Sequence, residues 1–140
     1  MSELLYKDEV FKLVGFSMEI HRELGKGHDE VIYKDAIVVE LQRAEIPFNR
    51  ELKYKVSYKG VILPHHYQAD FVVWNKILFE AKAVETLTDA HVKQALNYLA
   101  ASKLELGVLV NFGADSLEWK RVVLSRKTES KPLPKAFCLK

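Results

Sequence analysis

The sequence predicts a mixed α/β (α+β) domain over residues 1–125, with helices flanking a central mixed β-sheet, followed by a basic C-terminal tail over 126–140. Three segments repeat apolar residues at helical spacing, and the segments between and after them alternate or run apolar over strand lengths. With 140 residues, of which 49% are hydrophobic and 29% charged, the chain is long enough for one such domain and short for two.

The first two helices are expected in succession at the N-terminus. Residues 5–24 repeat apolar side chains at near-helical spacing and are followed by Gly25 and Gly27, which favour the end of a helix. Residues 29–44 carry acids in the first turn and an apolar face, until Pro47 ends the pattern. We therefore expect two adjacent helices joined by a short glycine-containing loop.

Three strands are expected next, forming two hairpins in series. Residues 52–58 alternate apolar and polar side chains, which predicts a half-buried strand. Residues 61–74 form the second strand, interrupted or bent near Pro64 because proline cannot donate to a ladder. Residues 76–84 form the third strand, with Asn75 at the turn.

The helical period returns at Thr88, a good N-cap, and predicts a third helix to about Ser102. The run over 106–112 is apolar throughout, which is typical of a strand covered on both faces, and 119–124 is expected as the last strand. The predicted order is therefore α, α, β, β, β, α, β, β.

Composition excludes several classes of protein. A single cysteine, Cys138, allows no internal disulfide or cysteine-based zinc cluster, so a reducing, cytoplasmic location is expected. No stretch approaches 18 consecutive apolar residues, so no membrane association is expected. The net charge is only +2, and the tail over 126–140 carries five basic residues against one acid. The tail is expected to be solvated, with phosphate contact as the alternative.

The second hairpin brings three charged side chains together. If its turn is centred on Asn75, Asp70 lies opposite Glu80 on one face, and Lys82 points to that same face. A two-residue turn would shift this pairing, so the prediction depends on a three-residue turn or a bulge. Facing carboxylates destabilise a sheet unless a cation lies between them.

Such a pair suits a hard divalent cation. Mg²⁺, or Mn²⁺ in its place, is held by one or two carboxylates and takes phosphate oxygens as further ligands. Asp70 and Glu80 are the candidate ligands, with the carbonyl of Ala81 as a possible third, and Lys82 would orient a nucleophile or neutralise phosphate charge. This is the chemistry of phosphodiester hydrolysis. The alternative is a plain cross-strand cluster of ion pairs.

At these residues the chain resembles the PD-(D/E)XK nuclease superfamily, and more closely its GxxExxY family. The superfamily's α-β-β-β-α-β core, a restriction-endonuclease-like arrangement, matches the predicted order. The proline of the superfamily's name is replaced by Ala69. The matching segments are Gly27–Tyr33 (GHDEVIY), Gln68–Asp70 (QAD), Phe79–Glu85 (FEAKAVE), Gln94–Leu99 (QALNYL) and Asn111–Gly113 (NFG).

The resemblance implies a metal-dependent nuclease, a hydrolase acting most plausibly on DNA. It implies that Asp70 and Glu80 bind the metal and that Lys82 is the catalytic lysine. It adds Glu30 as a further acidic ligand, Gln94 as a catalytic-site residue, and Tyr33 and Tyr98 as substrate-binding residues; these last groups have capping or packing roles as alternatives.

Two other functions remain open at this point: a nucleic-acid-binding module with a nuclease fold but no hydrolytic activity, and an oligomeric scaffold. A nuclease also needs a basic surface, and the candidates for a basic rim are Lys34, Arg43, Arg50, Lys53, Lys55 and Lys93. Because the chain is small and two-fold dimers are the commonest oligomers, a homodimer is expected.

Overall fold

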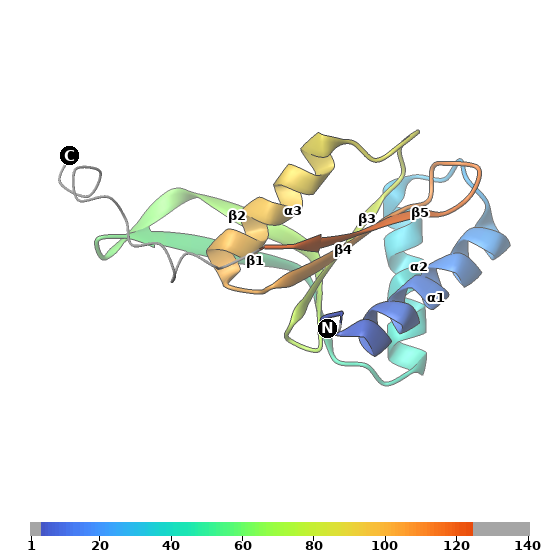
Figure 1. Ribbon diagram of the computed structural model, residues 1–140, viewed down its shortest axis with the longest axis horizontal. Helices are drawn as coiled ribbons and strands as arrows, with labels where there is room; N and C mark the ends of the chain where they lie inside the picture. The colour runs from blue at the N-terminus through green and yellow to red at the C-terminus, as the bar shows by residue number, and fades with distance from the viewer. Residues whose placement is uncertain (1–3, 125–140) are drawn as a thin grey trace.

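The computed structural model describes residues 4–124, so the predicted tail over 126–140 and Cys138 lie outside the described residues. The predicted order of elements is confirmed, with most boundaries shifted by a few residues (Figure 1). The elements are α1 (Lys7–Leu24), α2 (Glu30–Arg43), β1 (Phe48–Tyr58), β2 (Val61–Val73), β3 (Ile77–Lys82), α3 (Asp89–Ser102), β4 (Leu106–Asn111) and β5 (Glu118–Val123).

The strands form one mixed sheet in the order β1-β2-β3-β4-β5. Only β3 and β4 pair in parallel, and the other neighbours are antiparallel. The crossover between the two parallel strands is made by α3, as a parallel connection requires. The predicted mixed α/β fold with helices flanking the sheet is therefore confirmed.

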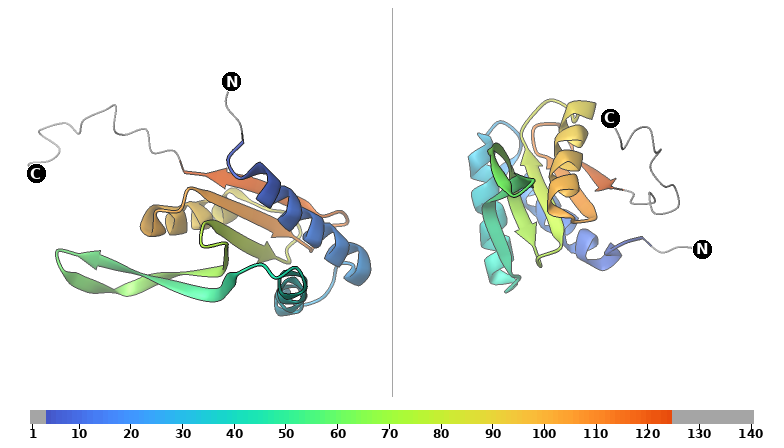
Figure 2. Two further views of the ribbon diagram at one scale, coloured as in Figure 1. Left: turned by 90° about the horizontal axis from the view of Figure 1, so that it is seen from below. Right: turned by 90° about the vertical axis from the view of Figure 1, so that its left-hand side faces the viewer.

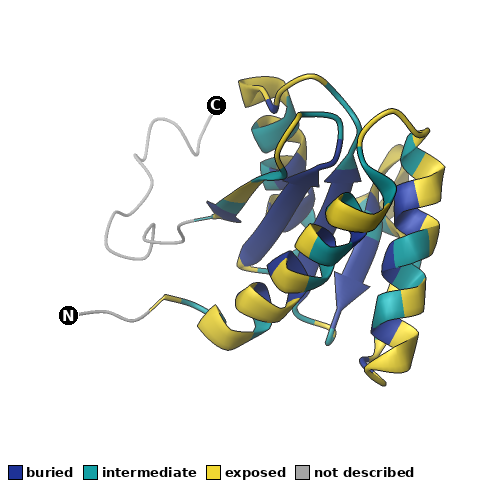
Figure 3. Cartoon of the chain, turned by 90° about the vertical axis from the view of Figure 1, so that its right-hand side faces the viewer, coloured by how far each residue is buried: buried dark blue, intermediate teal, exposed yellow. Residues whose placement is uncertain are grey.

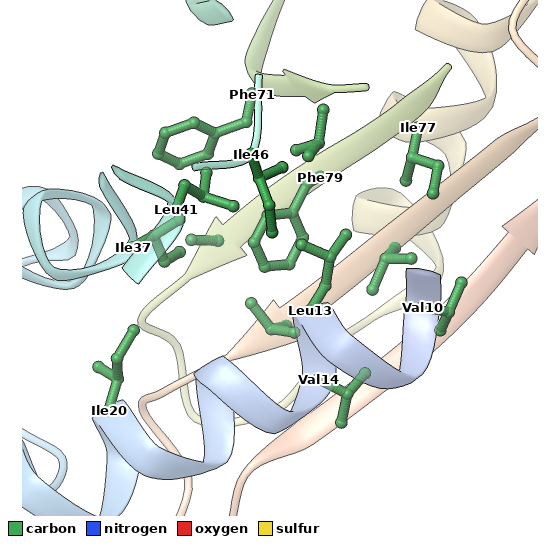
Figure 4. Packing of buried hydrophobic residues seen from close by; sticks show 14 of the residues in the cluster. Val10, Leu13, Val14, Ile20, Ile37, Leu41, Ile46, Phe71, Ile77 and Phe79 are labelled. Atoms are coloured by element: carbon green, nitrogen blue, oxygen red, sulfur yellow. The ribbon is translucent and has the colours of Figure 1, made fainter. Parts of the chain in front are cut away.

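The helices cover opposite faces of the sheet. The views in Figures 1 and 2 place α1 and α2 on one side and α3 on the other. Side chains of α1 and α2, such as Leu13 and Leu41, pack against Phe71 and Phe79 of the sheet (Figure 4). Leu99 of α3 packs in a second cluster on the other face, with Leu78 among its members. The central strands are therefore buried on both sides (Figure 3).

The first hairpin departs from the prediction. We call the segment Leu52–Ala69 the β1–β2 arm: its base packs against α3, and its outer part projects beyond the helices as a two-stranded extension (Figure 2). The expected half-buried face is confirmed at Tyr54 and Val56 and is wrong at its two ends, because Leu52 is 37% and Tyr58 59% exposed. The predicted irregularity near Pro64 is confirmed, because the pairing of β1 with β2 changes register there. Lys55 pairs with His66 and Ser57 with Ile62, so the shift lies opposite the part of β2 that contains Pro64.

Within residues 4–124, no helix is long and apolar enough to cross a membrane.

Candidate active site

The turn between β2 and β3 sets the register on which the site depends. Trp74 and Asn75 adopt positive φ angles of 56° and 58°, and the N–H of Lys76 donates to the carbonyl of Val73 at 3.1 Å. The strands that leave this three-residue turn pair Val73 with Ile77 and continue inward in the same register. The ladder ends at Phe71 and Phe79, and directly beyond it Asp70 hydrogen-bonds to Glu80, so the predicted juxtaposition is confirmed.

At Asp70 and Glu80 the carboxylates take the place of the sheet ladder. The N–H of Asp70 donates to Oε2 of Glu80 at 2.9 Å, and the N–H of Ala81 donates to Oδ2 of Asp70 at 2.9 Å. The two strands separate here because β2 continues into the arm with β1, where Glu51 has a φ of +56°. The acids are therefore held by the backbone of the neighbouring strand.

The environment of two acids of the site, Glu80 and Glu30, favours their neutral forms. Glu80 is only 5% exposed, and its pKa is raised from 4.5 to about 7, first by burial and then by the neighbouring Asp70 carboxylate. The pKa of Glu30, at the start of α2, is raised by burial and then by the charge of Asp70. The site thus carries more negative charge than its own cations balance.

Lys82 and two residues of α3 adjoin this pair. The ammonium of Lys82 donates to Oε1 of Gln94 at 3.2 Å. The buried Tyr98 lies close enough to Glu80 for that charge to contribute to a raised phenol pKa, after the larger effect of burial. Strand β3 and helix α3 therefore bring together four of the residues that the sequence singled out.

Lys34 is a central residue whose position the sequence analysis missed. Expected on a basic rim, it is nearly buried, with its ammonium 3.2 Å from Oδ1 of Asp70 and 3.2 Å from Oε2 of Glu51. Burial opposes its charged form, yet the carboxylates of Asp70 and Glu51 outweigh that effect and raise its pKa. Glu30 lies one helical turn away, at 4.0 Å, and this i, i+4 spacing was the signal that could have revealed the pairing.

Tyr33 lies in the core, where it orders the loop before α2. It is 0% exposed, its hydroxyl donates to the carbonyl of Gly25 at 2.5 Å and accepts from the N–H of His28 at 3.2 Å. Its ring stacks on Phe112 with centroids 4.5 Å apart. These contacts hold the loop that positions Glu30, and a role of Tyr33 in substrate binding stays a prediction.

The NFG segment secures the end of β3. Oδ1 of the buried Asn111 accepts from the N–H groups of Val84 and Gly113 at 2.9 and 3.0 Å. The N–H of Phe112 donates to the carbonyl of Lys82 at 2.8 Å. A Cβ on Gly113 would lie 2.3 Å from the carbonyl oxygen of Val84, so glycine is required for this close approach. The backbone that carries Lys82 is therefore fixed from β4.

The donor set fits a divalent cation that keeps much of its hydration. No group of three or more His, Cys, Asp or Glu side chains within residues 4–124 forms a ready-made metal cage. Asp70 and Glu80, whose carboxylates each accept a main-chain N–H from the facing strand, nevertheless supply the one or two carboxylates with which Mg²⁺ is usually held.

Comparison with known families is decisive for the assignment. The family model that matches is described as the PD-(D/E)XK nuclease superfamily, and the match spans residues 7–122. The chain belongs to this superfamily. The assignment of Asp70, Glu80 and Lys82 to the name-giving acids and lysine of a PD-(D/E)XK nuclease stays a prediction, as does that of the buried Ala69 to the position of the proline. Membership of the narrower GxxExxY family stays a prediction.

One solved structure is also similar to this chain. The crystal structure of SSO0001 is similar with a TM-score of 0.48 and 17% sequence identity, covering 86% of this chain and 69% of that one. A comparison with curated proteins found no match.

Proposed function

We propose that this PD-(D/E)XK nuclease hydrolyses phosphodiester bonds in DNA with Mg²⁺ or Mn²⁺ as its cofactor. The observation that carries the proposal is the meeting of Asp70 and Glu80 on adjacent strands, with Lys82 extending from the same strand as Glu80. A buried pair of acids with one raised pKa is costly for a structural sheet and useful for catalysis.

The metal ligands would be Asp70 and Glu80, with the carbonyl of Ala81 as a third protein oxygen and Glu30 supplying further negative charge. When bound, the divalent ion supplies Lewis acidity toward the phosphate and lowers the pKa of bound water. Lys34 contacts Oδ1 of Asp70, and main-chain N–H groups contact Oδ2 of Asp70 and Oε2 of Glu80. The ion would therefore take Oε1 of Glu80 and the second lone pairs of the other oxygens.

Lys82 and Gln94 would act on the water and the phosphate. The Lys82 ammonium donates one N–H to the amide oxygen of Gln94 at 3.2 Å. The other N–H groups of Lys82 would orient a nucleophilic water or neutralise developing charge on the phosphate. Tyr98 of α3, whose phenol pKa is raised by burial and then by the charge of Glu80, would contact substrate through its hydroxyl. Tyr33 is the more remote of the two predicted tyrosines.

The test is cleavage of supercoiled plasmid, linear duplex and an RNA of matched length, each with Mg²⁺, with Mn²⁺ and with EDTA. We expect metal-dependent cleavage of DNA that falls by at least about 10²-fold in Lys82→Ala and in Glu80→Gln. Lys12→Ala, an exposed lysine on α1, is the matched control and should retain full activity. Cleavage that survives in both site variants would refute the assignment, and binding without cleavage would favour a non-hydrolytic nucleic-acid-binding module.

A homodimer belongs to the same proposal. The outer edge of β5 pairs with no other strand among the described residues, and a groove of about 550 Å³ lies between α1 and this strand. Phe11, 80% exposed, lines the groove, and Lys7 and Asp8 let two-fold related copies pair opposite charges. Light scattering should give twice 16.1 kDa for the wild type and 16.1 kDa for Phe11→Ser. A monomeric wild type would refute this part.

A further inference from the structure

The β1–β2 arm carries one sign of charge. Between Leu52 and Ala69 the sequence contains Lys53, Lys55 and Lys59, two histidines and no acid. All three lysines are exposed, and no salt bridge in the described part of the chain involves them. The ammonium of Lys59 lies over the ring of Tyr58 at the arm's tip, 5.4 Å from its centroid. The arm is therefore a cationic extension with no balancing acid of its own.

The two faces of the arm have different surroundings. Tyr54 faces α3, where its ring meets Tyr98 with centroids 6.1 Å apart. Lys53 and Lys55 alternate with Tyr54, so both point to the opposite face, where their cross-strand partners are Gln68 and His66. The polar face is thus free of α3 and combines lysine, amide and imidazole donors.

The arm starts at the catalytic acids. Gln68, the partner of Lys53, precedes Asp70 by two residues, and His66, the partner of Lys55, precedes it by four. At about 3.3 Å per residue these pairs lie roughly 7 and 13 Å along the strand from Asp70. A strand from Leu52 to Tyr58 extends about 20 Å, which is the axial length of about six base pairs of duplex DNA.

We propose that the β1–β2 arm is a backbone-binding arm that holds the phosphates of duplex DNA beside the cleavage site. This inference rests on the proposed nuclease function and adds the surface that keeps the substrate in place. Binding would be independent of base sequence, because lysine ammonium groups contact phosphates as point charges. A second copy of the same arm would bring like charges together, so an anionic partner fits this surface better.

The experiment measures DNA binding without cleavage. Fluorescence anisotropy with a 20-base-pair duplex in EDTA, over a series of KCl concentrations, gives the slope of log K against log salt. Each lost phosphate contact reduces this slope by about 0.9, so Lys53→Ala/Lys55→Ala/Lys59→Ala should reduce it by about 2.7. Lys12→Ala/Arg22→Ala/Lys120→Ala removes three exposed charges from α1 and β5 and should leave the slope unchanged.

A second variant separates charge from folding. Replacing the three arm lysines by arginine keeps the charges, and this variant should bind with the slope of the wild type. The inference would be overturned if the arm variant with three alanines had the same slope as the control triple variant. It would also be overturned if the alanine variant aggregated while its slope stayed unchanged, which is the result expected if the lysines only protect an edge strand. Cleavage by the wild type, measured separately, shows whether the nuclease proposal fails or only the arm.

Discussion

Replacing Glu80 with glutamine tests the electrostatics of the site in a single measurement. The change removes one negative charge and keeps an oxygen that can accept the N–H of Asp70, now bonded to Oε2 of Glu80 at 2.9 Å. The pKa of Glu80 is raised from 4.5 to about 7, so the folded protein holds this proton more tightly than the unfolded chain does. The stability of the wild type therefore falls as the pH rises from about 4.5 to about 7.

The size of this effect follows from the same pKa values. The difference between 4.5 and about 7 corresponds to a loss of up to about 3 kcal/mol above pH 7. Without metal, Glu80→Gln should be more stable than the wild type by up to about 3 kcal/mol at pH 8 and nearly equal to it at pH 5. Magnesium at pH 8 should stabilise the wild type more than the variant, because the ion compensates the carboxylate.

Urea unfolding followed by tryptophan fluorescence, in EDTA at pH 5 and pH 8, gives these free energies. Glu23→Gln, which removes an exposed acid on α1, is the control and should change the free energy little at either pH. A Glu80→Gln variant that is less stable than the wild type at pH 8, or equally stable at both pH values, would show that Glu80 is not an uncompensated buried acid.

Three further changes test the surroundings of the site. Lys34→Met removes the nearly buried cation beside Asp70 and should destabilise the protein by ~3 kcal/mol in urea unfolding. If the charge alone matters, Lys34→Arg should be as stable as the wild type. Gly113→Ala places a Cβ 2.3 Å from the carbonyl of Val84 and should cost more than ~1 kcal/mol, while lowering cleavage through displacement of the end of β3. Tyr33→Phe removes the hydroxyl that holds the loop before α2; we expect a loss of ~1 kcal/mol by thermal unfolding, and an unchanged melting temperature would contradict that role.

The Asp70–Glu80 juxtaposition could be predicted because a strand register depends on local turn geometry. Once three residues form the turn, alternation alone determines which side chains share a face. Lys82 and Gln94 followed in the same way from strand and helix periodicity together with the family resemblance.

Lys34 and the exposure of the arm could not be predicted, since both depend on tertiary placement. Whether Lys34 lies on a rim or among acids depends on where Glu51 comes to lie, and a positive φ at Glu51 is invisible to periodicity. The alternation over 52–58 was real, but nothing in it says that the helices end before the arm does. Tyr33 was recognised as part of a motif, while its buried contacts with the loop required the structure.

The hydrogen bonds of Asp70 and Glu80 with the facing strand have a consequence for how this enzyme can change over time. In the proposed function, catalysis and the cohesion of the sheet depend on the same two carboxylates, each of which accepts a main-chain N–H from the facing strand. A homologue that loses activity by replacing either acid with a small apolar residue would also lose the hydrogen bonds that join the strands where the arm meets the core. Activity can therefore be lost with less damage to the fold by replacing the lysine, or by exchanging an acid for its amide, than by removing an acid side chain.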